Sequence, residues 1–278
     1  MNQFRQTSIL PPVVKNLLII NGLCFLANVV LESRFNYSLN SLLGLYYPAS
    51  TFFKPVQFLT HVFMHGSFMH LFFNMFSLWM FGSVLENHWG AKKFFIYYFV
   101  TALGAALLHL GVNTYEVYGL NTAIESYMTN PDINNFILFI QDHKQMVNAR
   151  AYEQLNSFYR EWMTQPGNPL YIQQSGELLQ SFIQLKMNIP VVGASGAVFG
   201  LLLAFGMLFP NTKLMLIFLP IPIKAKYFVL FYGALELFQG ISNNPGDNVA
   251  HFAHLGGMLF GFILIRIWKR TENPFNRF

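Results

Sequence analysis

The residues best suited to chemistry in this sequence are a serine and a histidine that both lie among glycines. Ser195 stands in Gly-Ala-Ser-Gly (193–196), and His254 stands in Ala-His-Leu-Gly-Gly (253–257), one helical turn after His251. A serine hydroxyl is a weak nucleophile, and an adjacent histidine can activate it as a base. The pair therefore indicates nucleophilic catalysis. A small-residue packing face is the competing interpretation of the first run, because a further glycine follows Gly196 at a spacing of four.

A second polar group precedes this pair and is suited to stabilising negative charge. His70 and Asn74 are four residues apart, so they share one face of a helix. Side-chain N–H donors directed at one point are what a developing oxyanion requires. A metal site is the competing interpretation, since His61 and His65 have the same spacing, but no acid lies between them as in the His-Glu-x-x-His motif of zinc proteases. We therefore expect neither a metal nor another cofactor.

The composition indicates that these side chains belong to a membrane protein. Hydrophobic residues make up 54% of the chain and charged residues 10%, and the mean hydropathy is +0.38. Soluble domains carry far more charge. The sequence pI of about 9.2 does not indicate a nucleic-acid partner, because no basic stripe with interleaved aromatic residues is present. The single cysteine, Cys24, excludes an intrachain disulfide.

Six apolar runs predict the helices that must position the candidate residues. They cover residues 13–31, 69–85, 94–112, 191–209, 227–241 and 249–268. About twenty residues cross the hydrocarbon core as a helix, and the runs lack the alternation of a barrel strand. We expect an all-α bundle of six spans in a lipid bilayer. The second, fourth and sixth spans begin on one side of the membrane, which places His70, Ser195 and His254 at similar depth.

The distribution of basic residues predicts the orientation of the bundle. With the N terminus in the cytoplasm, eleven of the 17 Lys and Arg residues lie near cytoplasmic ends of the spans. An even number of spans returns the C terminus to the same side. The first apolar run lacks a small-residue cleavage site and is expected to be a retained anchor. We therefore expect an integral multi-pass protein of the cell membrane whose candidate site opens to the extracytoplasmic side.

The segment 114–189 departs from the membrane pattern. It carries seven acidic and four basic residues, and apolar residues recur at helical spacing in 133–146, 151–163 and 176–187. We expect a small helical insertion outside the membrane, between spans three and four. The predicted divisions of the chain are an N-terminal tail with three spans, the insertion, the last three spans with Ser195 and His254, and a cytoplasmic tail: 1–113, 114–189, 190–268 and 269–278.

The motifs, in this order and on these helices, resemble those of the rhomboid family of intramembrane serine proteases. The resemblance rests on His70-x-x-x-Asn74, the serine run, the histidine run with glycines at 257 and 261, and a Glu-x-x-x-Gly-Ala turn at 86–91. It covers about residues 15–112 and 190–270. It implies that Ser195 is the nucleophile and His254 the base, a dyad without an acid. His70, Asn74 and the Ser195 backbone N–H would form the oxyanion hole.

The resemblance also implies supporting residues and a class of substrate. Gly193 would hold the loop before the serine, and His65 and His251 would support the site. The residues alone already indicate that Gly193 and Gly196 leave backbone N–H groups free for a substrate, and that Gly257 and Gly261 allow spans four and six to touch closely. The substrates would be transmembrane proteins, cut near the outer face of the bilayer.

Two other functional classes compete with a protease. Catalytically inactive rhomboid-like proteins bind membrane clients, but such relatives lack the serine, the histidine or both, and this chain has both. A transporter is disfavoured because the two halves of the chain show no matching pair of broken helices. One departure from the family concerns the first outer loop, where many members carry Trp-Arg and this chain has Val56-Gln57. That exchange leaves the packing and lipid contacts of the loop open.

Overall fold

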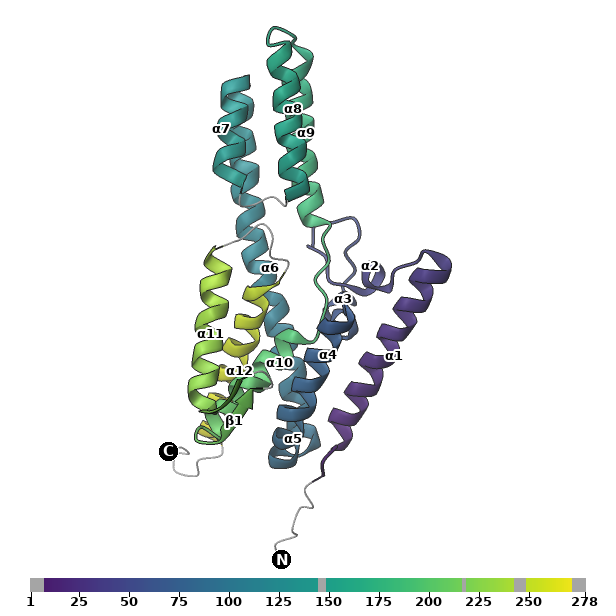
Figure 1. Cartoon of the computed structure of the whole chain (residues 1–278), viewed down its shortest axis with the longest axis vertical. Coiled ribbons are helices and arrows are strands. Elements are labelled where there is room, and N and C mark those ends of the chain that lie inside the picture. Colours follow the sequence, from purple (N-terminus) through teal and green to yellow (C-terminus); the bar gives the residue numbers. More distant parts are fainter. Residues whose placement is uncertain (1–7, 145–148, 217–218, 243–248, 272–278) are drawn as a thin grey trace, which may run out of the picture.

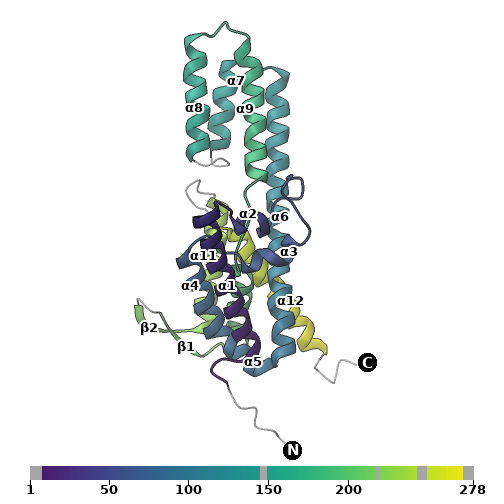
Figure 2. The same ribbon diagram turned by 90° about the vertical axis from the view of Figure 1, so that its right-hand side faces the viewer.

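Helices form nearly all the regular structure of the chain, as the apolar runs predict. The computed structural model describes residues 8–144, 149–216, 219–242 and 249–271. Its lower part is a bundle, and a second group of helices stands above the bundle (Figures 1 and 2). The bundle helices are α1 (Pro12–Phe35), α4 (Phe68–Ser77), the π-helical turn η2 (Leu78–Gly82), α5 (Ser83–Trp89), α6 (Ala91–Thr129), α10 (Ser195–Leu208), α11 (Ala225–Ser242) and α12 (His251–Thr271).

Short elements connect the bundle helices. The loop after α1 holds α2 (Leu39–Leu43), α3 (Gln57–Thr60) and the 3-10 turn η1 (His61–Phe63). An antiparallel hairpin of β1 (Lys213–Leu216) and β2 (Leu219–Lys224) joins α10 to α11 and projects from the bundle (Figure 2). The fold is thus the expected all-α bundle, with this hairpin as its small addition.

The bundle is built from helices suited to a membrane. In the described part of the chain, four helical stretches are long and apolar enough to cross one: α1, Phe68–Trp89, α6 and α12. The apolar helix α10 is shorter, with 14 residues. Large apolar side chains point outward, including Leu26 on α1 and Leu230 on α11, which are 61% and 71% exposed. Such faces suit hydrocarbon rather than water, and the protein is a membrane-embedded, multi-pass one. The count of six spans remains a prediction.

The helices α6, α10 and α12 pack at backbone distance because glycines line their contacts. A Cβ atom on Gly257 of α12 would overlap the carbonyl oxygen of Gly196 on α10. A Cβ atom on Gly196 would in turn overlap Ala105 of α6. Gly257 therefore lies where the backbones of α10 and α12 approach each other. Gly261 does not, because a Cβ atom there would overlap the hydroxyl of Tyr97, so this glycine admits α6 instead.

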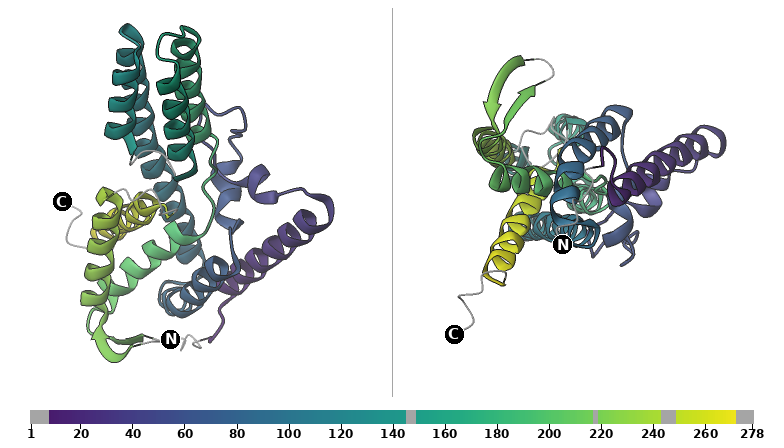
Figure 3. Two further views of the ribbon diagram at one scale, coloured as in Figure 1. Left: turned by 45° about the horizontal axis from the view of Figure 1, so that its top comes forward. Right: turned by 90° about the horizontal axis from the view of Figure 1, so that it is seen from below.

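The Glu-x-x-x-Gly-Ala turn ties the first span to the second and third. Glu86 is 3% exposed and accepts hydrogen bonds from the backbone N–H groups of Val13 and Val14, at 3.0 and 2.8 Å. These N–H groups open α1 and have no partner within the helix, and a carboxylate also suits the positive end of the helix dipole. Gly90 then ends α5 with a φ of 84°, in the region that favours glycine. From this attachment α1 slants away from the rest of the bundle (Figure 3).

The upper group of helices has a core of its own. The helices α7 (Ile133–His143), α8 (Ala149–Thr164) and α9 (Leu170–Met187) pack with the upper part of α6 around buried side chains such as Phe136 and Trp162. Helices α7, α8 and α9 fall on the three stretches of helical spacing, of which residues 145 and 146 lie outside the described part. However, α6 runs without a break through residue 114, where we expected the insertion to begin. The predicted divisions of the chain stay proposals, and residues 272–278 of the predicted tail lie outside the described part.

Candidate active site

The segment before Ser195 is not part of a helix, and backbone hydrogen bonds hold it to the loop that follows α1. Leu45 and Val191 exchange backbone hydrogen bonds of 2.9 and 2.8 Å, and the Gly193 N–H donates to the His61 carbonyl at 2.9 Å. The apolar run at 191–209 is therefore helical only from Ser195 onward. Ser195 becomes the first residue of α10, where backbone N–H groups lack intrahelical partners and the helix dipole favours negative charge.

The side chains of Ser195 and His254 meet across the α10–α12 contact. The Ser195 Oγ atom lies 2.9 Å from the Nε2 atom of His254. His254 is 7% exposed, and its ring stacks on Phe199, one turn after the serine, with ring centroids 4.1 Å apart and planes 9° apart. The stacking fixes the plane of the imidazole, so its Nε2 atom stays directed at the hydroxyl.

A buried acid on α11 completes this group and was not foreseen. The Oε2 atom of Glu236 lies 2.9 Å from Nδ1 of His254 and 2.7 Å from Nδ1 of His251. Glu236 is 7% exposed. The resemblance had implied a dyad without an acid, whereas the structure places a carboxylate behind the histidine. The ligand atoms of Glu236, His251 and His254 lie within 4.8 Å of one another, a spacing that could also hold a metal ion.

His70 and Asn74 lie on α4, which contacts α10. Gly193 has a φ of 122°, and a Cβ atom there would lie only 2.7 and 2.8 Å from Cε1 and Nε2 of His70. The His70 ring therefore lies against the backbone two residues before Ser195. Asn74 is 5% exposed, and its Nδ2 group donates to the His70 carbonyl at 3.0 Å. An amide has two N–H groups, so one remains for a further acceptor.

His61 and His65, the two histidines considered above as metal ligands, lie in the loop beside His70. The Nδ1 atom of His61 lies 2.8 Å from the Gln57 carbonyl oxygen. The ring of His65 lies 5.1 Å from that of His70 and is 1% exposed. Burial and the neighbouring His70 lower the pKa of His65 to about 4, so the side chain is neutral near pH 7. Within the described residues, His61 and His65 belong to no group of three metal-ligand side chains.

Of the two residues Val56 and Gln57, only Gln57 forms buried side-chain hydrogen bonds within the loop that follows α1. Gln57 is fully buried; its Nε2 group donates to the carbonyl oxygens of Leu42 and Phe52 at 3.2 and 3.0 Å, and its Oε1 atom accepts from the Lys54 N–H at 3.0 Å. Val56 is 53% exposed. The glutamine thus holds the loop that in turn holds the segment before Ser195.

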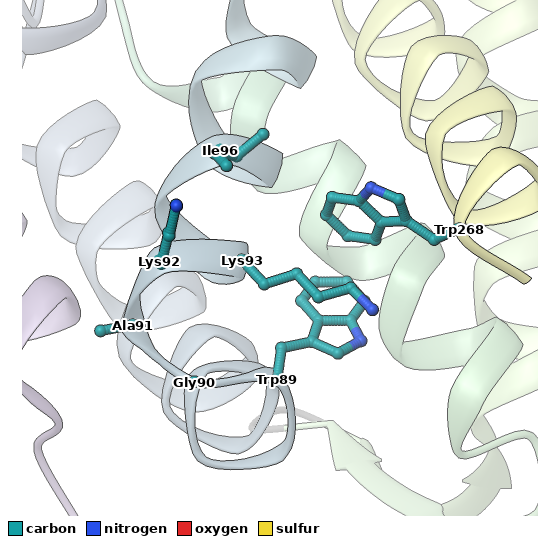
Figure 4. Close-up of a pocket in the computed structure, with 7 residues that line it drawn as sticks. All are labelled: Trp89, Gly90, Ala91, Lys92, Lys93, Ile96 and Trp268. Carbon is teal, nitrogen blue, oxygen red and sulfur yellow. The ribbon is translucent and has the colours of Figure 1, made fainter. Parts of the chain in front are cut away.

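One open pocket lies away from these residues. Its walls include Trp89, Lys93 and Trp268, where the start of α6 faces α12 (Figure 4). Lys93 Nζ is 4.5 Å from the centroid of the Trp268 ring. No predicted site residue lines this pocket, so it is separate from the group around Ser195 and His254.

Sequence reasoning missed Glu236 and Phe199. Glu236 is a lone acid in the apolar run 227–241, and an ionisable residue inside a span is costly and therefore a candidate for function. That rule alone would have singled it out. Phe199 follows Ser195 by four residues, which places both on one helix face, but an aromatic residue in an apolar span carries no signal of its own.

The chain is similar to known proteins over most of its length. The family model for the rhomboid domain matches residues 53–130 and 170–270. Rhomboid protein 1, mitochondrial, of Saccharomyces cerevisiae is 23% identical over 210 residues, which cover 76% of this chain and 41% of the yeast protein. The chain therefore spans less than half the length of that relative. The gap inside the family match, residues 131–169, includes α7 and α8 of the upper group of helices.

Proposed function

Since this chain belongs to the rhomboid family, we propose that it is a serine endopeptidase that cleaves the transmembrane segments of other membrane proteins. The observation that carries the proposal is the 2.9 Å approach of Ser195 Oγ to His254 Nε2, at the starts of two closely packed helices. A hydroxyl beside a neutral imidazole is an activated nucleophile. Both termini would lie in the cytoplasm and the site would open on the other side, because of the distribution of Lys and Arg.

The proposed reaction begins with transfer of the Ser195 hydroxyl proton to His254 Nε2 as Oγ attacks the scissile carbonyl carbon. The carbonyl oxygen becomes an oxyanion, which the Ser195 backbone N–H, His70 and Asn74 stabilise. The C–N bond then breaks, and His254 returns the proton to the leaving amine. Water, activated by the same histidine, hydrolyses the acyl-enzyme and frees the serine.

The substrate must expose a peptide bond that a helix normally hides. A helix in a membrane satisfies every carbonyl internally, so attack requires local unwinding. Glycine and proline weaken a helix, by about 1 and about 3 kcal/mol relative to alanine. We therefore propose single-span substrates that carry small residues at the cleavage site and glycine or proline nearby, close to the extracytoplasmic face.

The test is cleavage of a reporter with a helix-destabilised span, by the purified protein in liposomes. The expected result is cleavage by the wild type and none by Ser195→Ala or His254→Ala, with both variants folded as judged by thermal unfolding. His251→Ala should lose less activity than His254→Ala. Full activity of either Ser195→Ala or His254→Ala would refute the assignment. Failure of the wild type to cleave any such reporter would instead favour an inactive, client-binding protein.

A further inference from the structure

Glu236 lies where an acid can control the orientation and charge of His254. Its Oε2 atom faces Nδ1 of His254 at 2.9 Å, on the side of the ring opposite the serine, whose Oγ lies 2.9 Å from Nε2. The three side chains therefore form one line from α11 through α12 to α10. We propose that Glu236 is a positioning residue that makes this site a Ser-His-Glu triad, an inference that rests on the function proposed above.

The hydrogen bonds determine which nitrogen of His254 carries the proton. An ionised carboxylate can only accept, so His254 must present its N–H at Nδ1. The lone pair of a neutral imidazole is then at Nε2, where the Ser195 hydroxyl lies. The opposite tautomer would place an N–H toward the hydroxyl and leave His254 unable to accept its proton. The acid thus selects the only neutral form that can act as a base.

The same carboxylate also favours the charged state that forms during the reaction. When Nε2 takes the serine proton, His254 becomes an imidazolium and its Nδ1–H stays directed at Glu236. No proton passes to the acid, and the Nε2 proton later goes to the leaving amine. An opposite charge at hydrogen-bond distance stabilises the imidazolium strongly where water is scarce, and both residues are buried.

His251 explains how the carboxylate keeps its position. Its Nδ1 atom lies 2.7 Å from the same Oε2 atom, so two N–H groups from consecutive turns of α12 converge on one oxygen. Within the bounds of α10, α11 and α12, Glu236 is the only acidic residue. A lone carboxylate in apolar helices is costly unless it is paired. The carboxylate of Glu236 is therefore best explained by its effect on the tautomer and charge of these two histidines.

The first test is kinetic, with Glu236→Gln compared against the wild type in the reporter assay. The amide keeps the shape of the side chain but cannot carry charge. We expect kcat to fall by at least about tenfold, with about ten-thousandfold as the limit set by acid removal in soluble serine proteases, and KM to change little. A change in packing alone would have no reason to lower kcat selectively. Glu32→Gln is the matched control, since Glu32 is an exposed acid of α1, a helix at the edge of the bundle (Figure 1).

The second test reads the tautomer directly and needs no variant of the acid. NMR spectra of the wild type with ¹⁵N-labelled histidine distinguish protonated from unprotonated ring nitrogens, and the His254 signals are identified by their loss in His254→Ala. We expect the neutral ring to carry its proton at Nδ1. A proton at Nε2 would overturn the inference. This measurement also decides the matter if Glu236→Gln does not fold.

The outcomes separate this inference from the proposed function. If Ser195→Ala cleaves as well as the wild type, the protease proposal fails. If Ser195→Ala is inactive but folded Glu236→Gln has full kcat, only the role of Glu236 fails. A metal is the other ligand that this cluster could hold. Loss of wild-type activity with a chelator, restored by Zn²⁺, would assign the three residues to a metal and overturn the inference, and unchanged activity would support it.

Discussion

Asn74 offers the sharpest test of the oxyanion hole, because the structure limits what its side chain can contribute. One N–H of the amide donates to the His70 carbonyl at 3.0 Å, which leaves one N–H for the substrate. Loss of a single oxyanion donor costs roughly 100- to 1,000-fold in kcat, about 2.7–4 kcal/mol. His70 and the N terminus of α10 remain in Asn74→Ala. We therefore expect the lower end, about 100-fold, with KM nearly unchanged.

The assay is reporter cleavage in liposomes over a range of substrate density, so that kcat and KM are obtained separately. Phe73→Ala is the matched control, since that neighbouring side chain on α4 is 46% exposed and points away from the core. The His70 carbonyl should keep its backbone hydrogen bond within α4, so Asn74→Ala should fold. An effect on KM alone would refute the reasoning, because a donor that acts only on the oxyanion cannot alter binding of the ground state.

Three further predictions concern packing, the upper helices and pH. Gly257→Ala should lower both the Tm in detergent and the activity, because its Cβ would overlap the Gly196 carbonyl, whereas Gly111→Ala, with nothing within 4 Å of its Cβ, should leave both near wild type. Replacing residues 131–169 with a short Gly-Ser linker should change which substrates are cut while leaving cleavage of some intact; complete inactivation of a folded variant would show that the segment contributes to the site. The Tm should fall as the pH drops from about 7 toward 4, because His65, with its pKa of about 4, resists protonation in the fold more than in the unfolded chain, whose histidine pKa is about 6.5; a His65→Gln variant with the same slope would contradict this.

Much of the fold follows from hydrophobic patterning. Each of the six apolar runs coincides with a bundle helix, because such runs can satisfy their backbone groups in a membrane only as helices. The boundaries were less predictable. Residues 191–194 are as apolar as the helix they precede, yet they lie outside it because Leu45 and His61 offer backbone partners from a distant loop to Val191 and Gly193. The upper part of α6 continues past residue 114 because the helices α7 to α9 cover it with apolar side chains.

The site was predictable to the extent that its residues carry local signals. Ser195, His254, His70 and Asn74 could be named from their types and spacing. Their mutual approach depends on the contact between α10 and α12, which a sequence indicates only through its glycines. Glu236 comes from a third helix and reaches His254 across 18 residues of chain. The pairing of Glu236 with His254 was therefore not evident from their spacing in the sequence. The position of Glu236 in an apolar run nevertheless marked it as a candidate functional residue.

The most direct test of the central claim is to locate the covalent bond that the nucleophile forms. The purified wild-type protein is treated with a fluorophosphonate, which reacts with activated serines, and the modified peptide is identified by mass spectrometry. We predict a single adduct on Ser195 that is absent from His254→Ala, although that variant keeps the serine. An adduct on another serine, or equal labelling of Ser195 without the histidine, would contradict the proposed serine–histidine mechanism.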